Sequence, residues 1–118
     1  MTAITTSRPP ANPVVIGLVS GVLVAIPAIL AAVSSGGAGH GHYVAALALF
    51  PASMLLTLLQ RDMVGVFSII VGLLQFPVYG TLFGWSIMRK NYLPAVAVAL
   101  AHLIAATICF AATLPNFS

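Results

Sequence analysis

The segment from Met63 to Met88 limits the possible folds most, because it is long, apolar and free of charged residues. Its small and polar residues recur three, four or seven positions apart, so they share one face of a helix. These residues are Gly65, Ser68, Gly72, Gln75, Tyr79 and Ser86. The other faces carry mostly Val, Ile, Leu and Phe. This pattern is typical of a membrane span that packs its small-residue seam against other helices.

The composition of the whole chain supports the same class of protein. Of its 118 residues, 61% are hydrophobic and only 4% are charged, whereas about 25% of the residues in a soluble domain are charged. The net charge of +3 comes from isolated basic residues near the ends of apolar segments. Because these residues form no basic patch, we expect the bilayer as a partner and no nucleic acid.

Four apolar segments predict four membrane-spanning helices, at about residues 14–33, 43–59, 63–88 and 93–113. The first has about 20 residues, so as a helix it would measure roughly 30 Å, the thickness of the hydrocarbon core. The second is short, and Pro51 interrupts it. We therefore predict an all-α integral membrane four-helix bundle with short loops. Residues 14–113 would form a single domain, between a flexible tail at 1–13 and a short tail at 114–118.

Four spans would place both termini on the same side of the membrane. The basic residues are then divided equally, with Arg8 and Arg61 on one side and Arg89 and Lys90 on the other. Basic residues favour the cytoplasmic side, so an equal count gives little preference. We favour termini on the cytoplasmic side because the terminal amine adds a weak positive charge. The equal count also permits insertion in both orientations.

Polar residues within the spans can be placed by depth. At 1.5 Å per residue from the connection at 89–91, Tyr79 and His102 both lie roughly 13 Å deep on neighbouring spans. The same count pairs Gln75 with Thr107. With two serines from the first two spans, this predicts a polar layer near the midplane: Ser20, Ser53, Gln75, Tyr79, His102 and Thr107.

The predicted polar layer has two interpretations. Its members could hold the helices together, at about 0.6 to 2 kcal/mol for each polar contact. They could instead form a binding site or a pathway, because ionisable residues within a membrane are often functional. Both interpretations remain open at this point.

No cofactor is predicted, although histidines offer weak candidates for metal ligands. His40 and His42 could ligate a transition metal, but two imidazoles make an incomplete site. Haem ligation by His102 would need a second axial ligand, such as the same residue of another chain. The spans contain no Asp or Glu, and no serine has an evident base and acid set. An enzymatic role is therefore not favoured, and the question stays open.

The preferred function is that of a small non-enzymatic membrane protein, an interaction or accessory subunit acting through its small-residue seams. One such seam lies on the first span and includes Gly17 and Gly21. Because one copy is too small to enclose a wide pathway, we expect a homo-oligomer or a larger membrane complex. The alternative is an oligomeric small channel or transporter with the midplane polar site. A third possibility is a haem- or metal-binding membrane protein that uses its histidines.

Overall fold

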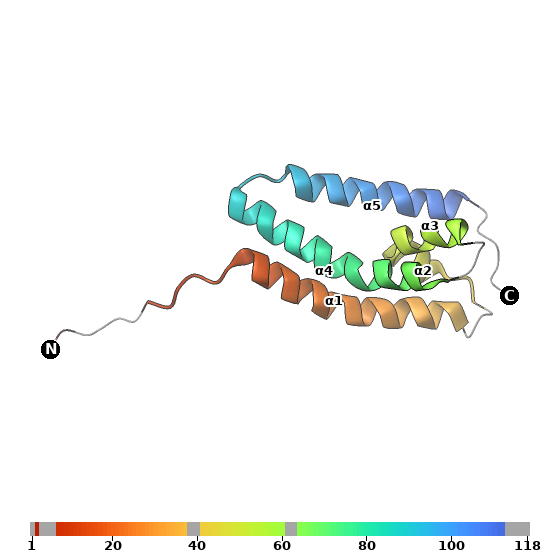
Figure 1. Cartoon of the computed structure of the whole chain (residues 1–118), viewed down its shortest axis with the longest axis horizontal. Coiled ribbons are helices and arrows are strands. Elements are labelled where there is room, and N and C mark those ends of the chain that lie inside the picture. The colour runs from red at the N-terminus through yellow and green to blue at the C-terminus, as the bar shows by residue number, and fades with distance from the viewer. Residues whose placement is uncertain (1, 3–6, 38–40, 61–63, 113–118) are drawn as a thin grey trace.

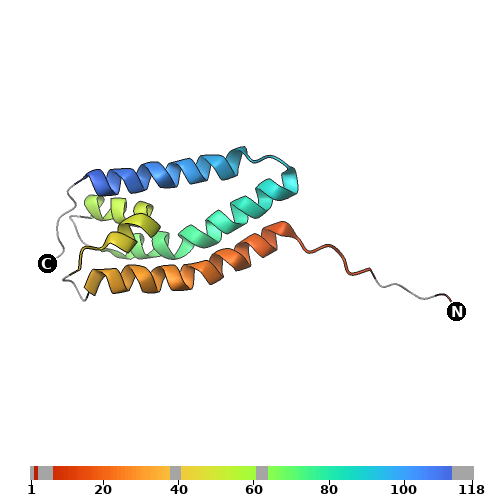
Figure 2. The same ribbon diagram turned by 180° about the vertical axis from the view of Figure 1, so that it is seen from behind.

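The computed structural model describes residues 2, 7–37, 41–60 and 64–112. These residues form five helices and, within these ranges, no strand. The helices are α1 (Pro13–Gly36), α2 (Val44–Leu49), α3 (Pro51–Leu59), α4 (Val66–Arg89) and α5 (Leu93–Ala111). The long helices α1, α4 and α5 lie along one another, and the short helices α2 and α3 sit together near one end of them (Figures 1 and 2).

Three of the helices are long and apolar enough to cross a membrane. α1, α4 and α5 have 24, 24 and 19 residues, and their most apolar windows have a mean hydropathy of 2.7, 1.8 and 2.2. Large apolar side chains cover their outer faces, such as Leu23, Phe67 and Leu103, which are 62%, 72% and 61% exposed. So much exposed apolar surface is what a lipid environment solvates and water does not.

α1 and α4 run antiparallel in close backbone contact through glycines. A Cβ atom added at Gly17 would collide with the carbonyl oxygen of Gly80, and one added at Gly80 would collide with that of Gly17. Gly84 approaches the backbone of Pro13 in the same way. Only residues without a side chain permit this approach, as in other small-residue helix pairs. The small-residue seam of α1 is therefore used within the chain.

The seam predicted on the 63–88 segment also faces the interior. Ser68, Gly72, Gln75 and Ser86 are all buried in α4. Pro77 lies inside this helix without ending it. The predicted boundaries of the long helices agree with the structure to within about three residues, and Thr113 and the tail at 114–118 lie outside the described residues.

The segment 43–59 differs from the single span predicted for it. Its helix breaks at Phe50, where φ is −127° and ψ is 49°. Pro51 has no N–H group, so a continuous helix would lose a hydrogen bond at this point. The resulting helices have 6 and 9 residues, too few for either to cross a membrane. α2 enters the bundle, and α3 returns to the end from which α2 came (Figure 1). We call residues 44–59 the α2–α3 hairpin.

The structure differs from the arrangement expected for four spans with both termini on the same side, because the α2–α3 hairpin turns back within the bundle and the helical part of the chain begins and finishes at opposite ends (Figure 1). We call the end of the bundle that contains Pro13, Arg89 and Leu93 the N-end, and the opposite end the hairpin end. The helical part of the chain begins at the N-end, where Pro13 contacts Gly84. It leaves at the hairpin end, where α5 finishes after three long helices instead of four (Figure 1).

Candidate functional site

The tip of the α2–α3 hairpin is held by side chains from α4 and α5. The Nε2 atom of Gln75 donates a hydrogen bond of 2.7 Å to the carbonyl oxygen of Leu49. The Nε2 atom of His102 lies 2.9 Å from the carbonyl oxygen of Ala48. These carbonyls belong to the last turn of α2, where the helix itself supplies no donors. The two side chains therefore cap a helix end in the interior of the bundle.

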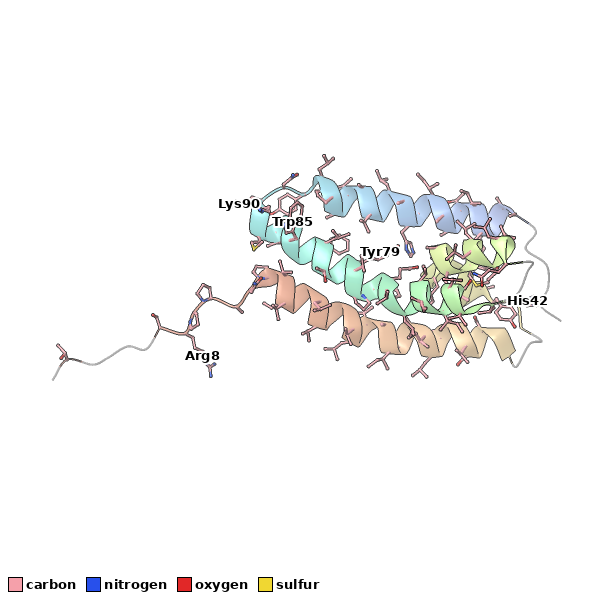
Figure 3. All side chains as sticks on the ribbon, viewed as in Figure 1. Arg8, His42, Tyr79, Trp85 and Lys90 are labelled. Carbon is pink, nitrogen blue, oxygen red and sulfur yellow. The ribbon has the colours of Figure 1, made fainter. Side chains whose placement is uncertain are left out.

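The hydrogen-bond partners of His102 determine which of its nitrogens carries a proton. A carbonyl oxygen can only accept, so Nε2 must be protonated. In the neutral ring Nδ1 then accepts, and the Tyr79 hydroxyl lies 3.2 Å from it. The Tyr79 hydroxyl thus donates to His102, which donates to Ala48. Figure 3 shows the position of Tyr79 on α4. The prediction that Tyr79 and His102 share one level is confirmed by this contact.

A second set of polar contacts ties α3 to α4. The Ser53 hydroxyl donates a hydrogen bond of 2.5 Å to the carbonyl oxygen of Ser68. The Gln60 amide donates to the Ser68 hydroxyl over 3.0 Å. Gln75 is only 5% exposed, and its Oε1 atom has no hydrogen-bond partner in the part of the chain that the structure describes. Both arms of the hairpin are therefore anchored by polar groups of α4 or α5.

Of the six residues in the predicted polar layer, four take part in these contacts: Ser53, Gln75, Tyr79 and His102. Ser20 is exposed on α1, and Thr107 is exposed on α5 and donates to the carbonyl oxygen of Leu103 in its own helix. The predicted pairing of Gln75 with Thr107 is wrong. The α2–α3 hairpin binds Gln75 instead, and the depth count took no account of a hairpin there.

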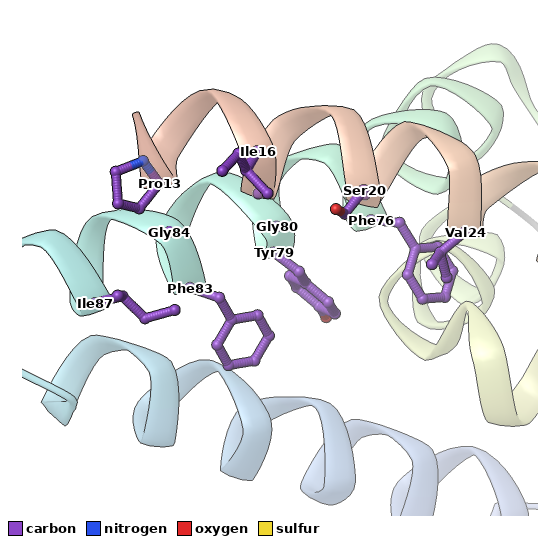
Figure 4. A pocket seen from close by; sticks show the side chains of 12 residues that line it. Pro13, Ile16, Ser20, Val24, Phe76, Tyr79, Gly80, Phe83, Gly84 and Ile87 are labelled. Atoms are coloured by element: carbon purple, nitrogen blue, oxygen red, sulfur yellow. The ribbon is translucent and has the colours of Figure 1, made fainter. Parts of the chain in front are cut away.

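An apolar groove occupies the N-end half of the bundle. One flank, between α1 and α4, encloses a cavity of about 620 Å³. The other flank, between α4 and α5, has a cavity of about 350 Å³. Both flanks share the side chains of Phe76, Tyr79 and Phe83, which form a ridge between them. Figure 4 shows these residues with those of α1 that line the larger flank. We call the two flanks and their ridge the N-end groove.

The N-end groove and the α2–α3 hairpin occupy two halves of the same trough. α1 and α5 do not contact each other within the described residues, so the space between them lies open above α4. In the hairpin half, α2 and α3 fill this space. The hairpin stops where the ring of Phe50 meets Phe76 edge to face, with the ring centroids 5.3 Å apart. Beyond this contact no helix of the described residues occupies the trough, and the N-end groove lies there.

The described residues contain no group of three His, Cys, Asp or Glu side chains that could hold a metal ion. His42 is exposed at the hairpin end (Figure 3). His102 lies at the hairpin tip, next to the carbonyl oxygen of Ala48. His40 lies outside the described residues. Cys109 is almost fully buried, and its thiol lies 3.5 Å from the carbonyl oxygen of Pro51. This cysteine therefore packs beneath the hairpin.

The depth count missed the most important partners at this site, the carbonyl groups of Ala48 and Leu49. Backbone groups carry no side-chain signal, but Pro51 in the middle of a short apolar segment does indicate a break in the helix. A broken helix leaves carbonyls that need donors, and Gln75 and His102 are the nearest interior candidates in depth. This reasoning would have located the hairpin tip.

These features define an all-helical protein with three long apolar helices, an interior hairpin and an open apolar groove. Comparisons with protein-family models, curated proteins and solved structures found no match for this chain.

Proposed function

We propose that the chain is an integral membrane protein that crosses the bilayer three times and inserts the α2–α3 hairpin from one side. Two observations support this topology. The three long helices match the thickness of the hydrocarbon core. The carbonyl groups freed at the hairpin tip are capped by Gln75 and His102. Non-helical backbone at such depth is tolerated only where protein groups or water satisfy it.

From this topology we also infer an orientation in the membrane. With three crossings, Arg8, Arg89 and Lys90 all belong to the N-end, which Figure 3 illustrates for Arg8 and Lys90. The connection between α3 and α4 contains Arg61, which lies outside the described residues. Basic residues favour the cytoplasmic side, and acidic residues contribute little to this preference. We therefore place the N-end in the cytoplasm and the hairpin end on the opposite side.

Within the membrane, the protein acts as a non-enzymatic interaction or accessory subunit that binds an apolar component in the N-end groove. The observation that carries this proposal is the N-end groove, in the half of the trough that no helix of the described residues fills. Ligand sites between helices are concave and mostly apolar, with volumes of about 300 to 1,000 Å³. The larger flank, at about 620 Å³, falls within this range.

The expected mechanism through small-residue seams needs revision for α1 and α4. Gly17 and Gly80 contact each other, so these seams are not free for another protein. α5 still exposes small residues, including Ala97 and Ala101. A homo-oligomer or a larger membrane complex would use this outer face of α5, while the N-end groove binds its own occupant.

The test is to purify the protein in mild detergent from its own membrane and to identify what remains bound at a fixed ratio. Ser20 lines the larger flank, and Trp at this position would fill it. Leu23 lies on the outer face of the same helix and is 62% exposed, so Leu23→Trp is the matched control. We expect a component that is retained by the wild type and the control and lost in Ser20→Trp. Equal retention in all three proteins contradicts a role for the groove.

A small transporter or channel is the second candidate, and the broken helix at the hairpin tip favours it. Secondary transporters often build their sites from interrupted helices near the midplane. Here Gln75, Tyr79 and His102 surround such a break. Solute flux into liposomes that is lost in Gln75→Ala, while the fold and oligomeric state are kept, would favour this candidate over the accessory subunit.

A further inference from the structure

We propose that the occupant of the N-end groove is an anionic phospholipid taken from the leaflet at the N-end. This inference rests on the proposed binding function of the groove. It adds the chemical class of the occupant, the direction in which it lies and the residues that select it.

The length of the groove matches one leaflet. Its lining on α4 runs from Ile87 at the N-end to Phe76, which contacts the hairpin. The eleven residue-to-residue steps between them correspond to roughly 16 Å of helix, about half of a hydrocarbon core of roughly 30 Å. An acyl chain that enters from the N-end surface would therefore end where the α2–α3 hairpin begins. The hairpin occupies the depth of the other leaflet.

The shape of the groove favours slender chains over a helix from another protein. A helix with side chains is about 10 Å wide. The larger flank offers about 620 Å³, and the ridge that includes Phe83 separates it from the smaller flank of about 350 Å³. A helix would have to displace this ridge. The two chains of a phospholipid can instead lie on either side of it.

The inner end of the groove is suited to the end of an acyl chain and not to a polar group. The Tyr79 hydroxyl is directed to His102, whose other nitrogen bonds to Ala48. The donor hydrogens of Tyr79 and His102 are therefore already used. Phe50 and Phe76 close this end with aromatic rings. A polar ligand group at this depth would find neither Tyr79 nor His102 free to donate to it, which makes its burial costly.

The charge at the outer end selects an anionic head group. Arg8, Arg89 and Lys90 give the N-end three positive charges, and the described residues contain no Asp or Glu. The guanidinium of Arg89 lies 5.8 Å from the ring centroid of Trp85, an aromatic residue suited to the membrane interface. Basic residues close to a membrane surface attract anionic lipids. A phosphate with net negative charge is thus preferred to a zwitterionic head group.

The test uses delipidated full-length protein in detergent, with phosphatidylglycerol and phosphatidylcholine of identical acyl chains as probes. Native mass spectrometry counts the lipids that remain bound. We expect one phosphatidylglycerol per chain, preferred to phosphatidylcholine by at least about fivefold for each basic residue that contacts the head group. Arg89→Gln combined with Lys90→Gln should bring the two lipids close to equal binding while the groove stays occupied.

Groove-filling variants show where the lipid lies. Ser20→Trp and Ala99→Trp fill the two flanks, and each should reduce the bound lipid at least about tenfold. Leu23 and Leu100 are exposed on the same two helices, at 62% and 54%, and line neither flank, so Leu23→Trp and Leu100→Trp should bind like the wild type. A loss in the control variants that equals the loss in the groove variants would overturn the proposed position.

Two further results distinguish a failure of the lipid proposal from a failure of the proposed binding function. Equal binding of both lipids by the wild type, or a groove filled by a protein helix, would overturn the proposal of an anionic phospholipid. The proposed binding function of the groove would still stand. If the wild type retains no lipid and no protein at a fixed ratio, both the inference and the proposed function are wrong.

Discussion

The Nε2 atom of His102 lies 2.9 Å from the carbonyl oxygen of Ala48, so one side chain of α5 closes the helix end that Pro51 leaves open. His102 also accepts the hydroxyl of Tyr79 at its other nitrogen. A single imidazole therefore joins α4, α5 and the α2–α3 hairpin. This arrangement explains how an ionisable residue is accommodated between the helices without a charged partner among the described residues.

Replacing His102 by Leu should destabilise the protein by about 1 to 3 kcal/mol, because Ala48 and Tyr79 would each lose a buried partner. Thermal unfolding in detergent measures the loss. The hairpin should also loosen, exposing the thiol of Cys109 that packs beneath Pro51. Maleimide labelling of this cysteine, the only one in the chain, should then become faster. His102→Gln keeps one hydrogen-bond donor, so this variant should recover part of the lost stability. An unchanged labelling rate of Cys109 in His102→Leu would contradict the role of His102 in capping α2.

Removing only the hydroxyl in Tyr79→Phe should cost less, about 0.5 to 1.5 kcal/mol. The imidazole keeps its bond to Ala48 in this variant, so labelling of Cys109 should stay close to that of the wild type. The same unfolding measurement provides the comparison. If Tyr79→Phe loses as much stability as His102→Leu, the Tyr79 hydroxyl, and not the bond of His102 to Ala48, contributes most of the stabilisation.

Gly80→Ala should weaken the α1–α4 pair by at least about 2 kcal/mol, because the added methyl group meets the backbone of Gly17 and cannot move aside. Gly72→Ala is the matched control on the same helix. A Cβ atom at Gly72 would have the Ser53 hydroxyl as its nearest neighbour, at 3.4 Å, which is an ordinary contact. The unfolding temperature of Gly80→Ala should therefore be clearly lower than that of Gly72→Ala. Similar values for the two variants would argue against close glycine packing between α1 and α4.

Reporters fused to the two ends of the chain should show opposite locations. Three crossings and a cytoplasmic N-end place a reporter at the N-terminus inside and one at the C-terminus outside. An enzyme active only outside the cytoplasm and a fluorescent protein that folds only inside give complementary readouts. Four crossings would give the same location for both ends. Arg89→Gln with Lys90→Gln should reduce the preference for this orientation.

The local patterns identified the long helices because apolar length and the spacing of small residues depend only on neighbours along the chain. The seam of α4 is buried as predicted, including Ser68 and Gly72. The level shared by Tyr79 and His102 followed from the helix rise and a short turn. The binding role of these residues stays a prediction.

The sequence by itself determined the class of this protein, an all-helical chain with apolar outer faces, because hydropathy and periodicity act over a few helical turns. Only the tertiary structure decided that residues 44–59 turn back at Phe50 and leave the other half of the trough open. Pro51 weakens the helix but does not choose between a kink and a reversal. That choice depends on donors from distant segments, Gln75 and His102, which can satisfy the freed carbonyls only once α4 and α5 are packed in place.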